Sequence, residues 1–194
     1  MALAYSDITV ELREISLKNR PQSLYAVSSK GTVPVLCISE SYVLDESLDI
    51  MLWALNCSDP ENWLDKDQKS QLEIIEVNDN EFKHWLDRYK YSDRYPEYDR
   101  EYYREKCENF LSTLSQLLIT NKYILHNHLA LVDIAIFPLI RQFANVDKLW
   151  FTKNYQALSI WLNNITETKL FLSIMDKYTE NNGEELIINF NFTN

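Results

Sequence analysis

The chain has 194 residues, 46% of them hydrophobic, which suffices for one or two domains with a packed core. Its 19 basic and 29 acidic residues give a net charge of −10, and no basic cluster favours nucleic acid or an anionic membrane. No apolar run is long enough to span a bilayer, and the first residues lack signal-peptide features. Three cysteines without Cys-x-x-Cys spacing predict a cytoplasmic protein with neither a disulfide framework nor a zinc site.

The first third of the chain predicts short helices and strands. Apolar and polar residues alternate where strands are expected, and glycine or proline marks the entry to the central stretch. The expected elements are a helix end at 1–5, a strand at 8–12, a short helix or turn at 20–27, and a strand, turn, strand and helix between 30 and 53.

The remainder predicts a helical domain that ends in a strand-like tail. Apolar residues recur at helical spacing, and one segment is apolar all round, which is typical of a buried central helix. The expected elements are a linker at 57–67, helices at 68–91, 100–120, 131–146, 155–165 and 169–178, and a strand-like run at 185–192.

A candidate binding site lies at the start of the helix near Ser47. Ser47 is a good N-cap residue, and the free N–H groups and positive dipole of a helix start suit a carboxylate. Glu46 beside it has the charge to hold an ammonium group. If the Val33–Pro34 bond is cis, the Val33 backbone is available to an extended peptide. Spacing alone leaves open a simpler interpretation, a capped helix beside an ordinary strand.

These residues resemble the glutathione-binding half of cytosolic glutathione transferases, most closely the omega-like and bacterial members with an active-site cysteine or serine. Those relatives carry Val-Pro before the third strand, Glu-Ser thirteen residues after the valine, and a basic residue with proline thirteen residues before it. Val33-Pro34, Glu46-Ser47 and Arg20-Pro21 match this spacing. The resemblance covers nearly the whole chain.

The resemblance implies a fold of α/β plus all-α class. A thioredoxin-like domain at 1–56, lacking its first strand and catalytic turn, would be followed by a linker at 57–67 and a transferase-type helical domain at 68–194. Within the site, the Val33 backbone would bind the cysteine part of glutathione, with Pro34 cis. Glu46 and Ser47 would hold the γ-glutamyl end, and Arg20 would reach the glycine carboxylate.

The catalytic residue stays unknown. The family uses Cys, Ser or Tyr at the start of its first helix, whereas residues 1–6 resemble the end of that helix. Tyr5 and Ser6 would therefore lie at the wrong end. The remaining candidates are thiols, and all three are expected to be packing residues: Cys37, Cys57 and Cys107.

Two further motifs are weaker. His126 and His128 offer metal ligands, but no third ligand is near in sequence, so a solvated loop is favoured. Residues 131–138 resemble the family's helix-capping motif, in which a Ser or Thr cap is paired with an Asp three residues later. Asp133 is present, but Ala130 stands at the cap, at an expected loss of about 1 kcal/mol.

The resemblance therefore implies a homodimeric protein that binds glutathione and needs no metal. The parent activity would be conjugation of glutathione to small electrophiles or reduction of a disulfide substrate, impaired here by the missing catalytic residue. The alternative is a non-catalytic binding or regulatory module of the same fold. The missing strand would leave a vacant slot in the sheet, and the run at 185–192 either enters it or, as the simpler alternative, packs outside the helical domain.

Overall fold

The computed structural model describes residues 1–65, 67–180 and 186–188. The chain divides into two compact units, one formed by Met1–Glu61 with Thr168–Asn194 and the other by Asn62–Glu167. The sequence predicts one helical domain over 68–194, whereas the compact helical unit ends at Glu167 and the residues after it group with the first unit.

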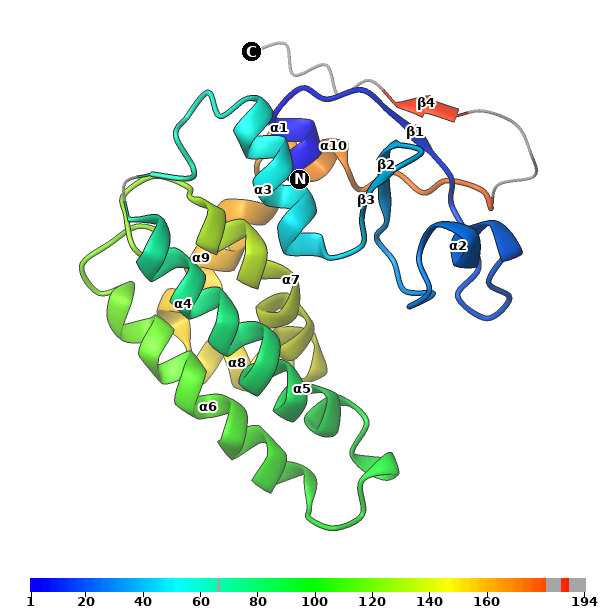
Figure 1. The fold of residues 1–194 in the computed structure, drawn as a ribbon. Helices are drawn as coiled ribbons and strands as arrows, with labels where there is room; N and C mark the ends of the chain where they lie inside the picture. The colour runs from blue at the N-terminus through cyan, green and yellow to red at the C-terminus, as the bar shows by residue number, and fades with distance from the viewer. Residues whose placement is uncertain (66, 181–185, 189–194) are drawn as a thin grey trace. The chain divides into compact units, whose positions relative to one another are not determined.

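The first unit has the small helices and strands of a thioredoxin-like domain (Figure 1). Its elements are α1 (Ala2–Tyr5), β1 (Val10–Leu12), α2 (Gln22–Val27), β2 (Leu36–Ser39), β3 (Tyr42–Leu44), α3 (Ser47–Cys57), α10 (Lys169–Ser173) and β4 (Leu186–Ile188). Helix α1 packs against α3. The apolar spacing of α3 predicts an inward stripe of Leu48, Met51, Leu52 and Leu55. Leu55 is buried as predicted, together with Ile50 and Ala54, whereas the other three are half-buried.

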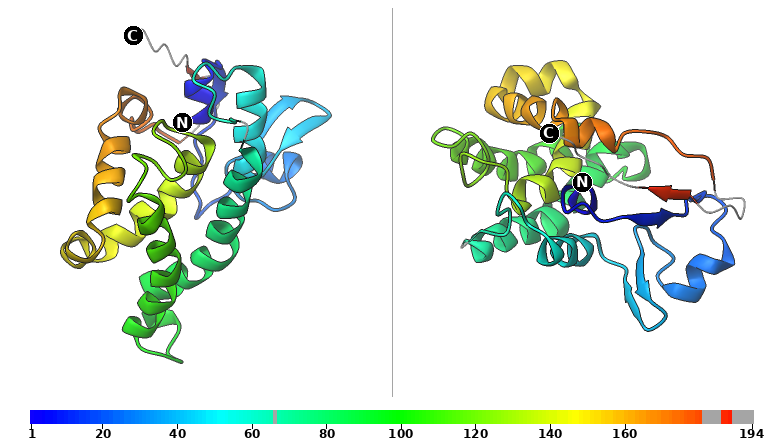
Figure 2. Two further views of the ribbon diagram at one scale, coloured as in Figure 1. Left: turned by 90° about the vertical axis from the view of Figure 1, so that its left-hand side faces the viewer. Right: turned by 90° about the horizontal axis from the view of Figure 1, so that it is seen from above.

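Two antiparallel strand pairs form in the described residues. Strands β2 and β3 pair around a turn at residues 40–41, as the polar turn predicts. Strand β4 pairs with β1, with Glu11 opposite Ile187 (Figure 2). The simpler expectation, that the tail packs outside the helical domain, is therefore wrong for 186–188. The unpaired backbone of β1 offers these residues a hydrogen-bonding edge. Residues 185 and 189–192 of the predicted run lie outside the described residues. Within the described residues no ladder joins β4 to β2, so β4 extends β1 without bridging the two pairs.

The second unit is helical, as predicted. Its elements are α4 (Gln68–Val77), the π-helical η1 (Asn78–Phe82), α5 (Lys83–Lys90), the 3-10 turn η2 (Ser92–Arg94), α6 (Arg100–Leu117), α7 (Leu131–Val146), α8 (Lys148–Asn154) and α9 (Gln156–Thr166). The predicted helix at 68–91 is thus interrupted by a π segment. Helix α8 is not predicted from the sequence, because its 7 residues are too few to show a helical period.

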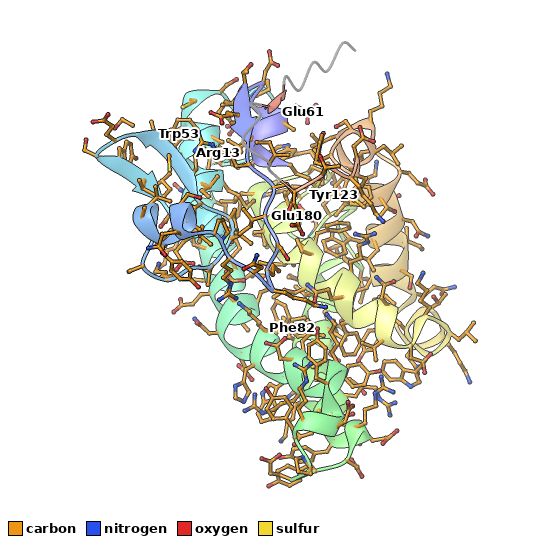
Figure 3. All side chains as sticks on the ribbon, turned by 90° about the vertical axis from the view of Figure 1, so that its right-hand side faces the viewer. Arg13, Trp53, Glu61, Phe82, Tyr123 and Glu180 are labelled. Atoms are coloured by element: carbon orange, nitrogen blue, oxygen red, sulfur yellow. The ribbon has the colours of Figure 1, made fainter. Side chains whose placement is uncertain are left out.

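Helix α7 is the centre of this unit and contacts α4, α5 and α8. Most of its side chains are fully buried, as expected for a helix that is apolar all round. Phe82, which Figure 3 labels, lies in the helical unit. Its ring centroid is 6.0 Å from the ring centroid of Phe143 of α7 and 5.3 Å from that of Phe110 of α6. The π segment therefore carries a side chain of the core.

Among the described residues, no helix combines the length and the apolar character needed to cross a bilayer.

Candidate functional site

The start of α3 leaves backbone donors available. Glu46 has extended backbone angles and is the N-cap, so the cap lies one residue before the predicted Ser47, which is the first helical residue. The Glu46 carbonyl accepts the first helical bond, from the Ile50 N–H at 3.1 Å. No side chain caps the helix. The N–H groups of its first turn are consequently unused by the helix and can bind an anion.

A lysine bridges two carboxylates beside this helix start. The Lys30 Nζ donates to Asp45 Oδ1 at 2.9 Å and to Glu46 Oε1 at 2.6 Å. Asp45 Oδ2 also accepts from the Ser28 hydroxyl at 2.7 Å. The hydrogen bonds to Glu46 and then Asp45 raise the pKa of Lys30 to about 12, and the Lys30 and Ser28 donors lower the pKa of Asp45. Two carboxylates share one ammonium, so the formal charge of the cluster is −1.

Gly31 makes the approach of Lys30 possible. Its φ is +61°, in the left-handed region that glycine adopts without strain. A Cβ at this position would clash with a ring carbon of Tyr25. The turn is closed by the Gly31 N–H, which donates to the Ser28 carbonyl at 3.2 Å. Backbone conformation and close packing thus both require glycine next to Lys30.

The other expected ligand residues are exposed. The Val33–Pro34 peptide bond is cis, the geometry that the resemblance implies, and the Val33 side chain is 47% exposed. Arg20 is exposed just before α2. Glu46 and Ser47 are adjacent by sequence. Within the described residues no hydrogen bond or ion pair links Arg20 to the other expected ligands.

Tyr5 and Ser6 have structural roles at the end of α1. The Tyr5 hydroxyl donates to Asp59 Oδ1 at 2.9 Å and accepts from the Glu61 N–H at 2.5 Å. The buried Ser6 hydroxyl donates to the Ser58 carbonyl at 2.7 Å. Burial, followed by the neighbouring carboxylate, raises the pKa of Tyr5. Both hydroxyls hydrogen-bond to the segment after α3 and so hold α1 against it. These contacts activate neither hydroxyl as a nucleophile.

Only one of the cysteines is a packing residue. Cys107 is fully buried in α6, and burial raises its pKa, so the thiol is unreactive. Cys37 and Cys57 are exposed, which corrects the expectation that they pack in a core. Cys37 lies on the outer face of β2, whose alternate residues are partly covered, and Cys57 is the last residue of α3.

Both parts of the chain match models of one protein family. The family model for the glutathione S-transferase N-terminal domain matches residues 1–63, and the model for the C-terminal domain matches residues 80–170. The chain belongs to the glutathione S-transferase family. Its fold of a thioredoxin-like domain and a helical domain is confirmed. None of the curated proteins compared with it matches the chain.

Several solved glutathione S-transferases share the fold. The transferase URE2P6 from Phanerochaete chrysosporium, in complex with oxidized glutathione, is 15% identical, with a TM-score of 0.76 over 88% of this chain and 85% of that one. The bacterial transferase BphK, solved as a ternary complex, is 18% identical, with a TM-score of 0.73 over 89% and 88%. The class Gtt2 enzyme of Vibrio parahaemolyticus is 18% identical, with a TM-score of 0.65 over 84% and 81%.

Sequence reasoning missed the bridging lysine and its partners. Lys30 lies three residues before Val33 and Asp45 directly before Glu46, but neither belongs to the matched motif. The Lys30-Gly31 pair was a usable signal. Glycine allows a tight turn with positive φ, and such a turn can direct the neighbouring lysine side chain toward residues on the next element.

Proposed function

We propose that this glutathione S-transferase family member binds glutathione at the start of α3. The γ-glutamyl carboxylate lies on the first-turn N–H groups and the Ser47 hydroxyl, and the γ-glutamyl ammonium lies on Glu46. One observation carries this proposal. Glu46 and Asp45 share a single ammonium, that of Lys30, so the cluster keeps one negative charge directly beside uncapped helix donors. An α-amino acid group, with opposite charges on one carbon, complements that arrangement.

The rest of the tripeptide has a place in the same unit. The Val33 backbone hydrogen-bonds the cysteine part of glutathione in an extended conformation, and Arg20 pairs with the glycine carboxylate. The complex of URE2P6 with oxidized glutathione supports this choice of ligand at the level of the family. A small electrophile or a disulfide is the second substrate of this proposal.

Calorimetric titration with reduced glutathione tests the site. Wild type is expected to bind, and the double variant Glu46→Gln with Ser47→Ala is expected to lose at least about tenfold in affinity, because a charge-assisted hydrogen bond contributes about 1.5–3 kcal/mol. The same dipeptide occurs at Glu40-Ser41 in the exposed turn between β2 and β3. Glu40→Gln with Ser41→Ala is thus a matched control that keeps wild-type affinity. Equal binding by all three proteins would place the site elsewhere.

A second candidate, a non-catalytic binding module, is favoured by the environment of the Tyr5 and Ser6 hydroxyls and of the Cys107 thiol. Tyr5 and Ser6 are engaged in structural hydrogen bonds, and Cys107 is buried. The same preparation is expected to bind glutathione in the calorimetric titration. It is expected to show no conjugation when it is assayed with chlorodinitrobenzene. Robust turnover that is lost in Tyr5→Phe or Ser6→Ala would reject the non-catalytic candidate and leave the binding proposal intact.

A further inference from the structure

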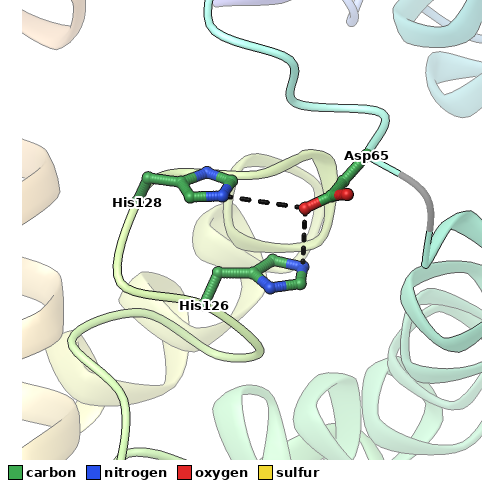
Figure 4. A group of neighbouring side chains, drawn as sticks. All are labelled: Asp65, His126 and His128. Carbon is green, nitrogen blue, oxygen red and sulfur yellow. Dashed lines mark ion pairs between the residues drawn. The ribbon is translucent and has the colours of Figure 1, made fainter.

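Three metal-ligand side chains meet in the helical unit, outside the proposed glutathione site. Asp65 precedes α4, and His126 and His128 belong to the loop before α7 (Figure 4). The Nε2 atoms of both histidines lie 3.7 Å from the same oxygen, Asp65 Oδ2. The three potential ligand atoms all lie within 4.8 Å of one another. The sequence lacked a third ligand near the histidines, and the fold supplies one from 61 positions earlier, since 126 − 65 = 61.

The ring orientation of His128 presents a ligand lone pair to the centre of this cluster. Its Nδ1 lies 3.0 Å from the carbonyl oxygen of Leu129, which can only accept a hydrogen bond. Nδ1 therefore carries the proton, and in the neutral imidazole Nε2 is left unprotonated and directed at Asp65. A backbone carbonyl that holds one ring nitrogen while the other binds an ion is the usual second partner of a metal-ligating histidine.

His126 has an unsatisfied nitrogen in the same place. Its Nε2 is shielded from solvent and has no hydrogen-bond partner among the described residues. A buried nitrogen without a partner costs free energy that a bound ion would recover. The two imidazole rings are stacked, with centroids 5.1 Å apart and an interplanar angle of 4°. This parallel arrangement brings both Nε2 atoms toward one point.

A simple ion-pair cluster explains these contacts less well. A separation of 3.7 Å is too long for a hydrogen bond from either imidazole to Asp65. If both rings were protonated, two positive charges would lie in stacked contact beside a single carboxylate. If one ring or neither were protonated, His126 Nε2 would still have no hydrogen-bond partner among the described residues, because Asp65 Oδ2 lies 3.7 Å away. An ion between the three side chains removes both difficulties.

We propose that Asp65, His126 and His128 bind a zinc ion, with water as the fourth ligand. Two imidazoles with one carboxylate are a donor set that zinc accepts, and three protein ligands leave one position open. Zinc with ligands at 2.0–2.1 Å in tetrahedral geometry separates neighbouring ligand atoms by about 3.3 Å. The two histidine–aspartate separations are within about 0.4 Å of that value. The histidine–histidine separation is within 4.8 Å, so rotation of the imidazoles toward each other completes the site.

The ion would join two segments that are already adjacent. The Trp63 carbonyl accepts from the Leu131 N–H at 3.0 Å, and the Leu64 carbonyl accepts from the Gln71 side chain at 2.9 Å. The Tyr123 N–H donates to the His126 carbonyl at 2.9 Å, which closes the histidine loop on itself. Both ligand-bearing segments are thus held in place before the ion binds, and zinc adds a cross-link between the entrances to α4 and α7.

Zinc titration of protein without a polyhistidine tag tests the proposal. Wild type is expected to bind one equivalent by calorimetry and to melt at a higher temperature with zinc, because an ion that binds only the folded state stabilises it. His128→Gln is expected to lose at least about tenfold in affinity and to lose the thermal shift. His128 is half-exposed, so this variant keeps the fold. The matched control is His84→Gln, since His84 lies on α5 and is the third histidine of the chain.

Imidazole NMR spectra separate this site from zinc bound to the exposed Cys37 and Cys57 thiols. Zinc is expected to shift the resonances of His126 and His128 and to leave those of His84 unchanged. Asp65→Asn is expected to weaken binding as His128→Gln does. Absence of binding by wild type, equal binding by His128→Gln, or unperturbed His126 and His128 resonances would each overturn the proposal.

Discussion

At the scale of single residues, Asp133 shows how one buried carboxylate organises a helix start. Its Oδ1 accepts from the Ile124 N–H at 3.0 Å and from Trp161 Nε1 at 2.7 Å, and its Oδ2 accepts from the Ala130 N–H at 3.1 Å. Burial raises its pKa to about 6, so the carboxylate is still ionised at pH 7 and accepts all three bonds. Asp133 thus supplies its half of the capping box, whereas Ala130 has no acceptor to supply the other.

Replacing Asp133 with alanine is expected to cost about 3–4 kcal/mol of unfolding free energy, because three buried N–H donors would lose their acceptor. The melting temperature is expected to fall by roughly 10 °C. The control is Asp147→Ala at the N-cap of α8, where an exposed carboxylate accepts one N–H bond, from Trp150 at 3.0 Å. That variant is expected to lose only about 1 kcal/mol. Equal losses in thermal denaturation would show that burial adds nothing to the role of Asp133.

The glutathione-site residues predicted from the sequence between 33 and 47 lie within one short stretch of chain. Val33, Glu46 and Ser47 stand at fixed spacings on neighbouring elements, so a resemblance could locate them. The contact between Lys30 and Glu46 depends on the positive φ of Gly31, which spacing does not reveal. Asp65 joined the two histidines only through tertiary packing of the helical unit.

At the scale of elements, the pairing of β4 with β1 is the feature least accessible from sequence. The strand character of the tail was predicted from its β-branched and aromatic residues. Its partner lies at the other end of the chain, and local pattern carries no information about such a distant ladder. By contrast, the predicted helix at 131–146 coincides with α7, because its apolar run is long and bounded.

Removing residues 184–194 is expected to destabilise the first unit, because the backbone groups of Val10–Leu12 would lose their ladder. Thermal denaturation should show a lower melting temperature, and hydrogen exchange should show faster exchange at β1. Deleting only 190–194, beyond β4, is the matched control and should change neither measurement. If the amides of Leu186–Ile188 exchange like a free terminus in the full chain, the pairing does not persist in solution.

At the scale of the whole molecule, the helical unit carries a groove with an apolar floor. Its volume is about 450 Å³, and residues of α4, η1 and α6 line it. Phe82 and Phe110 are buried at this groove, and Val77 on its wall is 41% exposed. The family resemblance implies a homodimer, and we expect this groove, with the exposed Val77 on its wall, to form part of the contact.

Sedimentation over a wide concentration range is expected to show a dimer for the wild type and a monomer for Val77→Asp, because burying an unpaired carboxylate at the contact is costly. Leu149→Asp on α8 is the control, since Leu149 is 87% exposed and distant in sequence from the groove. It should remain dimeric. A wild type that stays monomeric at every concentration would contradict the assembly, and a dimer in both variants would move the contact away from the groove.

The discontinuous make-up of the first unit has a consequence for biosynthesis. The ribosome makes Met1–Glu61 first, yet α10 and β4, which group with that segment, follow only after Asn62–Glu167. At about 5–20 residues per second, the roughly 100 intervening residues take on the order of 5–20 s. During that interval the nascent β1 edge has no β4 to pair with and is open to chaperones or to other chains. The helical unit, whose residues are contiguous, can finish folding on the ribosome before the first unit is complete.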